Sequence, residues 1–268
     1  NKKHLKFKYF KELFFLILTK LRSRTYFYAV SKYSKASWVN FSKVNKNKVR
    51  VIYNSIKPRQ NKQSKKQFKR KFFREFKIPE NSKIILSAGR ICFHKRQDFI
   101  IESLYPILKE NNIYLVFVGE YDFGNQKSLE TKNRIKLLIK KNNIQSNIRF
   151  CGFREDLKEI MSISDLFVHS TLTESFGLVL LEAMREGLPI VSTNVDAIPE
   201  IVSEPDNYLV DINETKTFRN CVLSVLNRNY KTSIEVSKRN KNIAKNKKFT
   251  SKERTKEMFK YFKGILDV

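Results

Sequence analysis

The sequence has few cysteines and no long apolar run, and each absence argues against a class of protein. Its three cysteines, at positions 92, 151 and 221, are scattered and form no C-x-x-C pair or Cys/His ligand spacing. This pattern favours a reduced, cytosolic compartment and argues against a zinc site. The early apolar run that contains residues 14–18 is far short of the ~20 residues of a membrane helix, and no small-residue cleavage site follows it. We therefore expect no transmembrane helix and no signal peptide.

Acidic residues are scarce at both ends of the chain, whose net charge is +28. Residues 1–78 carry 24 Lys and Arg against two Glu, and residues 228–268 carry a net charge of +9. Residues 79–227 carry a net charge of −3. Basic flanks around a near-neutral centre indicate attachment to an anionic membrane leaflet or to nucleic acid. A genome-wide preference for lysine and asparagine codons is the alternative, although it does not explain the near-neutral centre.

Short apolar runs alternate with helical patterns from residue 83 onward. The predicted strands are residues 84–88, 114–118, 148–151, 166–169, 190–192 and 208–210, and the predicted helices are residues 98–110, 127–141, 156–162 and 178–186. This alternation predicts an α/β fold with a doubly wound parallel sheet, whose ligands bind at the carboxyl ends of the strands.

The first 78 residues cannot close a core of their own. They predict a basic amphipathic helix over residues 5–21 and then two strands, at 26–30 and 50–53, with a helix between them. Residues 57–71 are polar and basic, and we interpret them as a linker or solvated arm. A carboxy-terminal helix over residues 251–266 is expected to place Phe259, Phe262 and Leu266 on one face, against the amino-terminal part.

The segment 173–183 places two carboxylates, Glu174 and Glu182, on either side of a glycine that opens a helix. Ser175, Phe176 and Gly177 then supply free backbone N–H groups at the positive end of the helix dipole, which suit a diphosphate. Glu182 lies roughly 7.5 Å along the helix at about 1.5 Å per residue, which is about the distance from a diphosphate to its ribose. The geometry favours a nucleotide-sugar over a plain nucleotide.

A second group of candidate residues follows the first strand of the sheet. Gly89 permits close backbone approach, and Arg90 and Lys95 could neutralise a diphosphate, although surface charge alone would explain these cations. The sequence has neither a P-loop nor a G-x-G-x-x-G fingerprint. The histidines at 94 and 169 are as well explained by solvated or structural roles. Glu200 is expected to cap the short helix that follows it.

Several ordered segments together resemble the nucleotide-binding half of the GT-B glycosyltransferases, specifically glycosyltransferase family 4. The resemblance covers residues 79–215 and rests on Gly89-Arg90 with Lys95, Val116 to Gly119, Phe150 to Phe153, Ser164 to Val168, Glu174 to Leu178, Glu182-Ala183-Met184, Gly187 to Val191 and Ile198-Pro199-Glu200. Upstream, Ala29-Val30-Ser31 and Val51 to Ser55 look like the last strand-helix-strand of that family's amino-terminal domain.

The resemblance implies retaining transfer of a sugar from a UDP-, GDP- or ADP-sugar, with no cofactor and no obligatory metal ion. By analogy Arg90 and Lys95 bind the diphosphate and Glu174 binds the donor sugar. The remaining assignments follow the same analogy: Glu182 to the ribose, Gly89 and the backbone of Ser175, Phe176, Gly177 and Leu178 to the phosphates and sugar, and Phe153 and Arg154 to the base. Two positions depart from the family pattern, because Arg96 and the pair Asp196-Ala197 stand where glycines are usual.

The resemblance also divides the chain into four parts. These are a remnant of the amino-terminal acceptor domain (1–57), a basic linker (58–78), the nucleotide-sugar-binding domain (79–245) and a carboxy-terminal helix (246–268) that packs back on the amino-terminal part. Because most of the acceptor domain lies outside the sequence, which begins at Asn1 rather than methionine, a fragment is one explanation.

The leading hypothesis is a transferase that acts on a glycan or lipid-linked acceptor of cell-surface polysaccharide or glycolipid. It would be cytoplasmic and peripheral at the anionic inner membrane face, held there by the basic amino-terminal arm. The alternative is a non-catalytic or split-subunit module that binds the nucleotide-sugar. Nucleic-acid binding through the basic flanks is disfavoured, because the sequence has no recognition motif.

Overall fold

A six-stranded parallel sheet forms the centre of the protein. The computed structural model describes residues 25–57, 64–110, 112–122, 124, 126–202 and 206–266. The sheet order is β5-β4-β3-β6-β7-β8, and every neighbouring pair is parallel. The strands are Lys83–Ala88 (β3), Ile113–Val118 (β4), Ile148–Phe150 (β5), Leu166–His169 (β6), Ile190–Thr193 (β7) and Tyr208–Val210 (β8). The order runs outward from β3 in one direction and from β6 in the other, so the sheet has a switch point between them.

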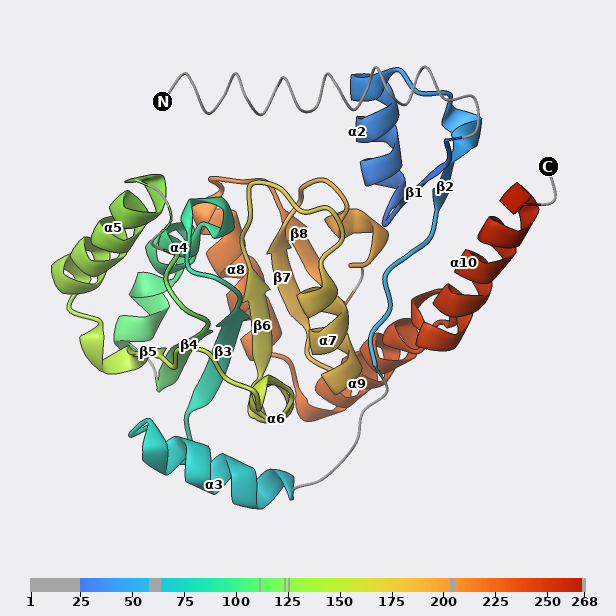
Figure 1. The fold of residues 1–268 in the computed structure, drawn as a ribbon. Coiled ribbons are helices and arrows are strands. Elements are labelled where there is room, and N and C mark those ends of the chain that lie inside the picture. Colours follow the sequence, from blue (N-terminus) through green and yellow to red (C-terminus); the bar gives the residue numbers. More distant parts are fainter. Residues whose placement is uncertain are drawn as a thin grey trace.

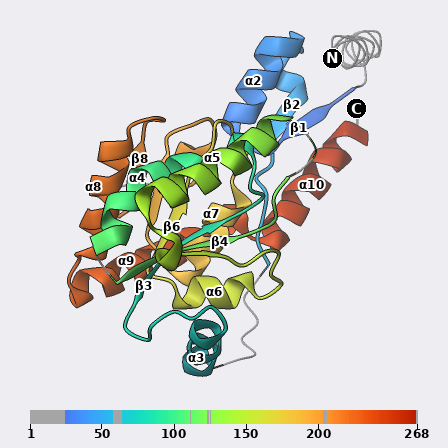
Figure 2. The same cartoon turned by 90° about the vertical axis from the view of Figure 1, so that its left-hand side faces the viewer.

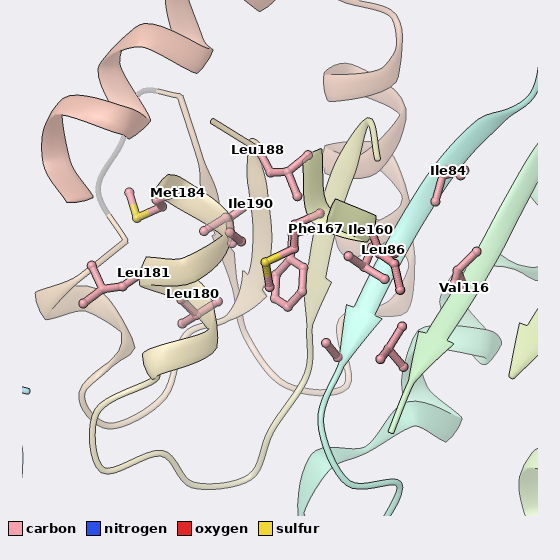
Figure 3. Close-up of a cluster of buried hydrophobic side chains, with 14 of the residues drawn as sticks. Ile84, Leu86, Val116, Ile160, Phe167, Leu180, Leu181, Met184, Leu188 and Ile190 are labelled. Atoms are coloured by element: carbon pink, nitrogen blue, oxygen red, sulfur yellow. The ribbon is translucent and has the colours of Figure 1, made fainter. Parts of the chain in front are cut away.

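Helices cover both faces of this sheet (Figures 1 and 2). One face carries α4 (Gln97–Glu110), α5 (Gln126–Asn142) and α8 (Thr215–Leu226), and the other carries α6 (Leu157–Ile163) and α7 (Leu178–Glu186), with α9 (Tyr230–Ala244) packed on α7. Alternate residues of a strand enter opposite cores: Ile84 and Leu86 pack with the α6 and α7 side chains, whereas Ile85 packs on the other face. Figure 3 shows the first of these cores. The predicted doubly wound α/β fold is confirmed.

The expectation of a solvated linker is wrong from residue 64 onward. Residues Lys65–Glu75 form helix α3, which contacts α6 below the main sheet in Figure 1. Phe68, Phe72 and Phe73 are at most 5% exposed and belong to the same core as Ile84. Three phenylalanines on one face of a lysine-rich segment are enough to fold it onto the domain, because the lysines stay on the solvent side.

The amino-terminal residues form the predicted strand-helix-strand. Strands β1 (Phe27–Ala29) and β2 (Val49–Val51) pair in parallel, and α2 (Lys32–Ser42) connects them. The predicted helix over residues 5–21 lies outside the described residues. No helix in the described part of the chain combines the length and apolarity needed to cross a bilayer.

Helix α10 (Ser251–Leu266) has the predicted bounds and lies beside the amino-terminal unit (Figures 1 and 2). The contact is polar: the Tyr261 hydroxyl donates to the Phe27 carbonyl at 2.7 Å, and Arg50 pairs with Glu257 at 2.8 Å. The predicted apolar contact is wrong, because the three residues expected to form it are 71%, 48% and 84% exposed (Phe259, Phe262 and Leu266).

Candidate active site

Three glycines follow neighbouring strands at the carboxyl edge of the sheet. Gly89 follows β3, Gly119 follows β4 and Gly152 lies just beyond β5, and the Gly119 N–H donates to the Gly152 carbonyl at 2.8 Å. A Cβ on Gly119 would lie 2.1 Å from the Gly89 carbonyl oxygen, so this crossing requires glycine. A Cβ on Gly89 or Gly152 would meet nothing within 4 Å. The backbone is therefore open to a ligand at Gly89 and Gly152, as the sequence predicts for Gly89.

Helix α7 begins at this edge and has the predicted bounds, 178–186. Gly177 precedes it with φ 95°, a left-handed conformation that glycine adopts without strain. No described residue accepts a hydrogen bond from the backbone N–H of Ser175, Phe176 or Gly177. Free N–H groups at the positive end of a helix suit an anionic group. Leu178 is 43% exposed at the same end.

Lys95 and Glu174 form an ion pair beside these N–H groups. Lys95 Nζ lies 2.6 Å from Glu174 Oε2, and the Nε2 atom of the buried His169 lies 3.6 Å from the same oxygen. Burial opposes ionisation of Glu174, but interactions with His169 and Lys95 prevail and lower its pKa to about 2. Burial lowers the pKa of His169, against the effect of Glu174. The cluster at neutral pH is therefore a carboxylate, an ammonium and an uncharged imidazole.

Arg90 lies in the loop between β3 and α4 that also carries Lys95. Its side chain is exposed and has no partner among the described residues, so its charge is available to a ligand. Arg96, one of the two departures from the family pattern, has φ 46°. A glycine would adopt this left-handed conformation more easily, and Asp196, the other departure, has φ 50°.

Glu182 lies on the second turn of α7 and is partly buried. Burial raises the pKa of its carboxyl, and Arg185 and Lys158 only partly oppose this effect. No described residue forms a hydrogen bond or ion pair with Glu182. A partly buried carboxylate without a partner can accept hydrogen bonds from a ligand's hydroxyl groups.

Phe153 and Arg154 differ in whether they are free to contact a ligand. Phe153 is 72% exposed. Arg154 binds Glu75 of α3 at 2.6 Å and Asp156 at 2.7 Å, and both carboxylates raise the pKa of its guanidinium. Two carboxylates already neutralise Arg154, so of this pair only the Phe153 ring is free to stack on a base. Their assignment to the base stays a prediction.

Sequence reasoning missed the residues that hold the Glu174 loop. Asp196 Oδ2 accepts from the Thr173 hydroxyl at 2.6 Å and from the Glu174 N–H at 2.9 Å. Burial opposes ionisation of Asp196, but the hydrogen bonds from Thr173 and Tyr33 lower its pKa. The departure from glycine at this position was the only signal in the sequence that could have indicated Asp196.

The expected role of Glu200 is wrong. Its carboxylate does not cap the helix that follows it in the chain but accepts from the Lys32 N–H at 2.9 Å and the Tyr33 N–H at 2.8 Å, at the start of α2.

As for metal ions, the described residues contain no group of three or more His, Cys, Asp or Glu side chains that could hold one.

Comparison with known proteins gives a family and a fold. Residues 68–249 match the family model described as "Glycosyl transferases group 1". The chain is 32% identical over 143 residues to the N-acetyl-alpha-D-glucosaminyl L-malate synthase of Bacillus anthracis, covering 53% of this chain and 35% of that protein. It is 32% identical over 120 residues to the lipopolysaccharide glucosyltransferase WaaG of Escherichia coli K12, covering 44% of this chain and 30% of that protein. The match therefore spans about a third of these curated relatives.

Solved structures show the same fold at low identity. The crystal structure of Anabaena HepE in complex with UDP and glucose has a TM-score of 0.79 and 19% identity, covering 89% of this chain and 63% of that one. A glycosyltransferase from Rickettsia africae has a TM-score of 0.77 and 20% identity, covering 91% and 64%. These similarities establish the two-faced α/β architecture of the GT-B glycosyltransferases.

Proposed function

Because the chain belongs to the glycosyl transferases group 1 family, we propose that it binds the nucleoside-diphosphate sugar of a family 4 glycosyltransferase. The reaction transfers the sugar to an acceptor hydroxyl with retention of configuration. The bond from the anomeric carbon to the diphosphate oxygen breaks, and a bond from that carbon to the acceptor oxygen forms on the same face. The acceptor proton passes to the departing diphosphate.

The Lys95–Glu174 ion pair beside the free N–H groups of residues 175–177 carries this proposal. It places a cation, an ionised carboxylate and the start of a helix within one loop cluster. In the donor complex Lys95 and Arg90 stabilise the charge that builds on the diphosphate, as preorganised cations do in other transferases. Glu174 Oε1, which has no partner among the described residues, accepts from a sugar hydroxyl.

Glu182 supplies the second carboxylate, for the ribose. Glu182 lies five residues after Gly177, roughly 7.5 Å along the helix at about 1.5 Å per residue. This spacing from the proposed phosphate-binding N–H groups matches the distance from a diphosphate to its ribose. The positive charge needed by the leaving group comes from Arg90, Lys95 and the helix start, so the proposed reaction has no obligatory metal ion.

For the acceptor, we propose a cell-surface polysaccharide or a glycolipid. The name of one relative, a lipopolysaccharide glucosyltransferase, supports this class. The 24 basic residues among the first 78 support docking at an anionic membrane surface. Vesicles that contain anionic lipid should sediment with the chain at low salt, whereas neutral vesicles should not.

A second candidate is a module that binds the nucleotide-sugar but needs another polypeptide for transfer. The observation that favours it is that residues 68–249, which match the family model, contain every donor-site residue named above, so this segment by itself holds the proposed donor site. Donor turnover separates the two candidates: the chain alone hydrolyses or transfers the sugar in the first and only binds it in the second.

Isothermal titration with UDP-, GDP- and ADP-glucose tests donor binding. We expect one of the three to bind, and Lys95→Ala to weaken that binding at least tenfold. The matched control is Lys109→Ala, which removes an equal charge from an exposed position in the last turn of α4. Absence of binding by all three nucleotide-sugars, or equal losses in the two variants, would contradict the proposed site.

A further inference from the structure

We propose that the turn formed by residues 196–200 couples helix α2 to the loop that carries Glu174, and that Glu200 is the positioning residue of this coupling. The inference rests on the proposed donor site, because the loop held by the turn is the loop assigned to the donor. The coupling joins α2, which precedes residue 58 in the sequence, to loops that follow residue 63.

Glu200 completes the start of α2. A helix leaves the N–H groups of its first turn without partners inside the helix. Here Glu200 accepts from the first two, those of Lys32 and Tyr33, and the Ser31 hydroxyl accepts from the third, that of Ser34, at 2.9 Å. The carboxylate also lies at the positive end of the helix dipole, which adds to its attraction.

A third donor fixes the carboxylate from the other side. The Tyr53 hydroxyl, just beyond β2, donates to Glu200 Oε2 at 3.0 Å. The Tyr53 ring lies 6.1 Å from that of Phe176, in the Glu174 loop. Glu200 thus binds two segments of the amino-terminal unit.

The same helix start reaches the Glu174 loop directly. The hydroxyls of Ser31 and Ser34 donate to the Ser175 carbonyl at 2.8 and 3.0 Å. Because a peptide unit is planar, a fixed Ser175 carbonyl also fixes the direction of the Phe176 N–H. That N–H is one of the free donors of the proposed phosphate site.

The other end of the turn holds the same loop. Asp196 accepts from Thr173 and from the Glu174 N–H, and the Ala197 N–H donates to the Glu174 carbonyl at 3.2 Å. Ala197 and Ile198 are fully buried between these two contacts, so the turn cannot shift easily at one end alone. Figure 1 shows α2 beginning on the side of its unit that faces the main sheet. A movement of α2 should therefore be transmitted to the Glu174 loop through residues 196–200.

Hydrogen exchange measured by mass spectrometry on the whole chain tests the coupling without any ligand. Glu200→Gln keeps the side-chain shape but turns one acceptor into an NH₂ group that faces the N–H donors of α2. We expect exchange to become at least tenfold faster for the amides in the first turn of α2 and for the hydrogen-bonded amides of Glu174 and Ala197. Exchange in β3 and β4 should not change. The control is Glu80→Gln, the same change at an exposed glutamate.

A second variant keeps the test valid if Glu200→Gln unfolds the chain. The double substitution Ser31→Ala and Ser34→Ala leaves Glu200 in place but releases the Ser175 carbonyl, so the amides of Glu174 and Ala197 should again exchange faster. Faster exchange confined to α2 in both variants would make Glu200 a local cap only and would overturn the coupling.

The bound protein gives the reciprocal test. Saturating donor should slow exchange in the first turn of α2 in the wild type, and this effect should fall at least fivefold in Glu200→Gln. Equal protection of α2 in both proteins would contradict the coupling. If no nucleotide-sugar protects residues 173–177 even in the wild type, the proposed function fails, and the ligand-free comparison still decides the coupling.

Discussion

Lys95 Nζ lies 2.6 Å from Glu174 Oε2, although 79 positions separate the two residues in the chain. The loops after β3 and β6 bring them together, because these strands are neighbours at the switch point of the sheet. Both side chains are mostly buried, 28% and 15% exposed. Water therefore screens this pair less than it screens a surface ion pair.

The first prediction concerns the acid stability that Glu174 contributes. Its pKa in the folded protein, about 2, lies below the ordinary value of 4.5. A carboxyl with a depressed folded pKa adds stability that is fully present above the unfolded pKa and is lost as the pH falls through the folded pKa. Glu174→Gln should therefore be less stable than wild type by a constant amount above about pH 4.5, and the difference should shrink below it. Urea unfolding between pH 7 and 3 measures this, and a difference that grows on acidification would contradict it.

The second prediction concerns Glu182 and donor affinity. Glu182→Gln should weaken nucleotide-sugar binding about 10- to 100-fold, since hydrogen bonds to a charged group contribute roughly 1.5–3 kcal/mol. Because burial raises the pKa of Glu182, wild-type affinity should begin to fall at a higher pH than an ordinary carboxyl would require. The variant should lack this acid limb. Titration calorimetry from pH 8 to 4 gives both results, with Glu155→Gln, an exposed glutamate, as the control. Ribose binding by Glu182 is refuted if the two variants bind alike.

The third prediction uses three glycines in different surroundings. Gly119→Ala should destabilise the protein by about 2 kcal/mol or more, because its Cβ would lie 2.1 Å from the Gly89 carbonyl oxygen and its φ is 139°. Gly89→Ala has a similar φ but no clash, and should cost less. Gly264→Ala, inside α10 with nothing within 4 Å, should stabilise by roughly 0.5–1 kcal/mol. Thermal unfolding should rank the three in this order, and any other order would show that the close crossing at Gly119 is not the cause.

The fourth prediction tests whether α3 is part of the folded domain. Phe72 is 1% exposed and packs in the main core, whereas the neighbouring Lys71 is exposed. Phe72→Ala should lower the free energy of unfolding by about 3–5 kcal/mol. Lys71→Ala should leave it within about 0.5 kcal/mol. If chemical denaturation shows similar small effects for both, this segment is a solvated linker after all.

Local patterns account for the parts of the fold that the sequence predicts well. The bounds of α7 follow from Gly177, Gly187 and the apolar run between them, all within eleven residues. The strands follow from short apolar runs between polar loops. Such features depend on neighbours in the chain, so the sequence alone specifies them.

The sequence predicts which charged side chains lie at the candidate site, but not which residues hold the loops that carry them. Glu174, Lys95 and Arg90 stand in motifs, and their meeting at one edge follows from a parallel sheet. The contacts made by Asp196 and Glu200 follow no local pattern. Glu200 meets its α2 partners across 167 and 168 positions, which no spacing rule anticipates.

By itself, therefore, the sequence determined a doubly wound parallel sheet with two acids and two cations at its carboxyl edge, because periodicity, helix ends and strand order are local or topological. Only the tertiary structure decided which charged groups were already paired. In the folded chain Arg154 pairs with Glu75, α3 packs into the core and Glu200 accepts hydrogen bonds from α2. Burial and pairing depend on the neighbours that long-range packing supplies, and packing is complete only in the folded chain.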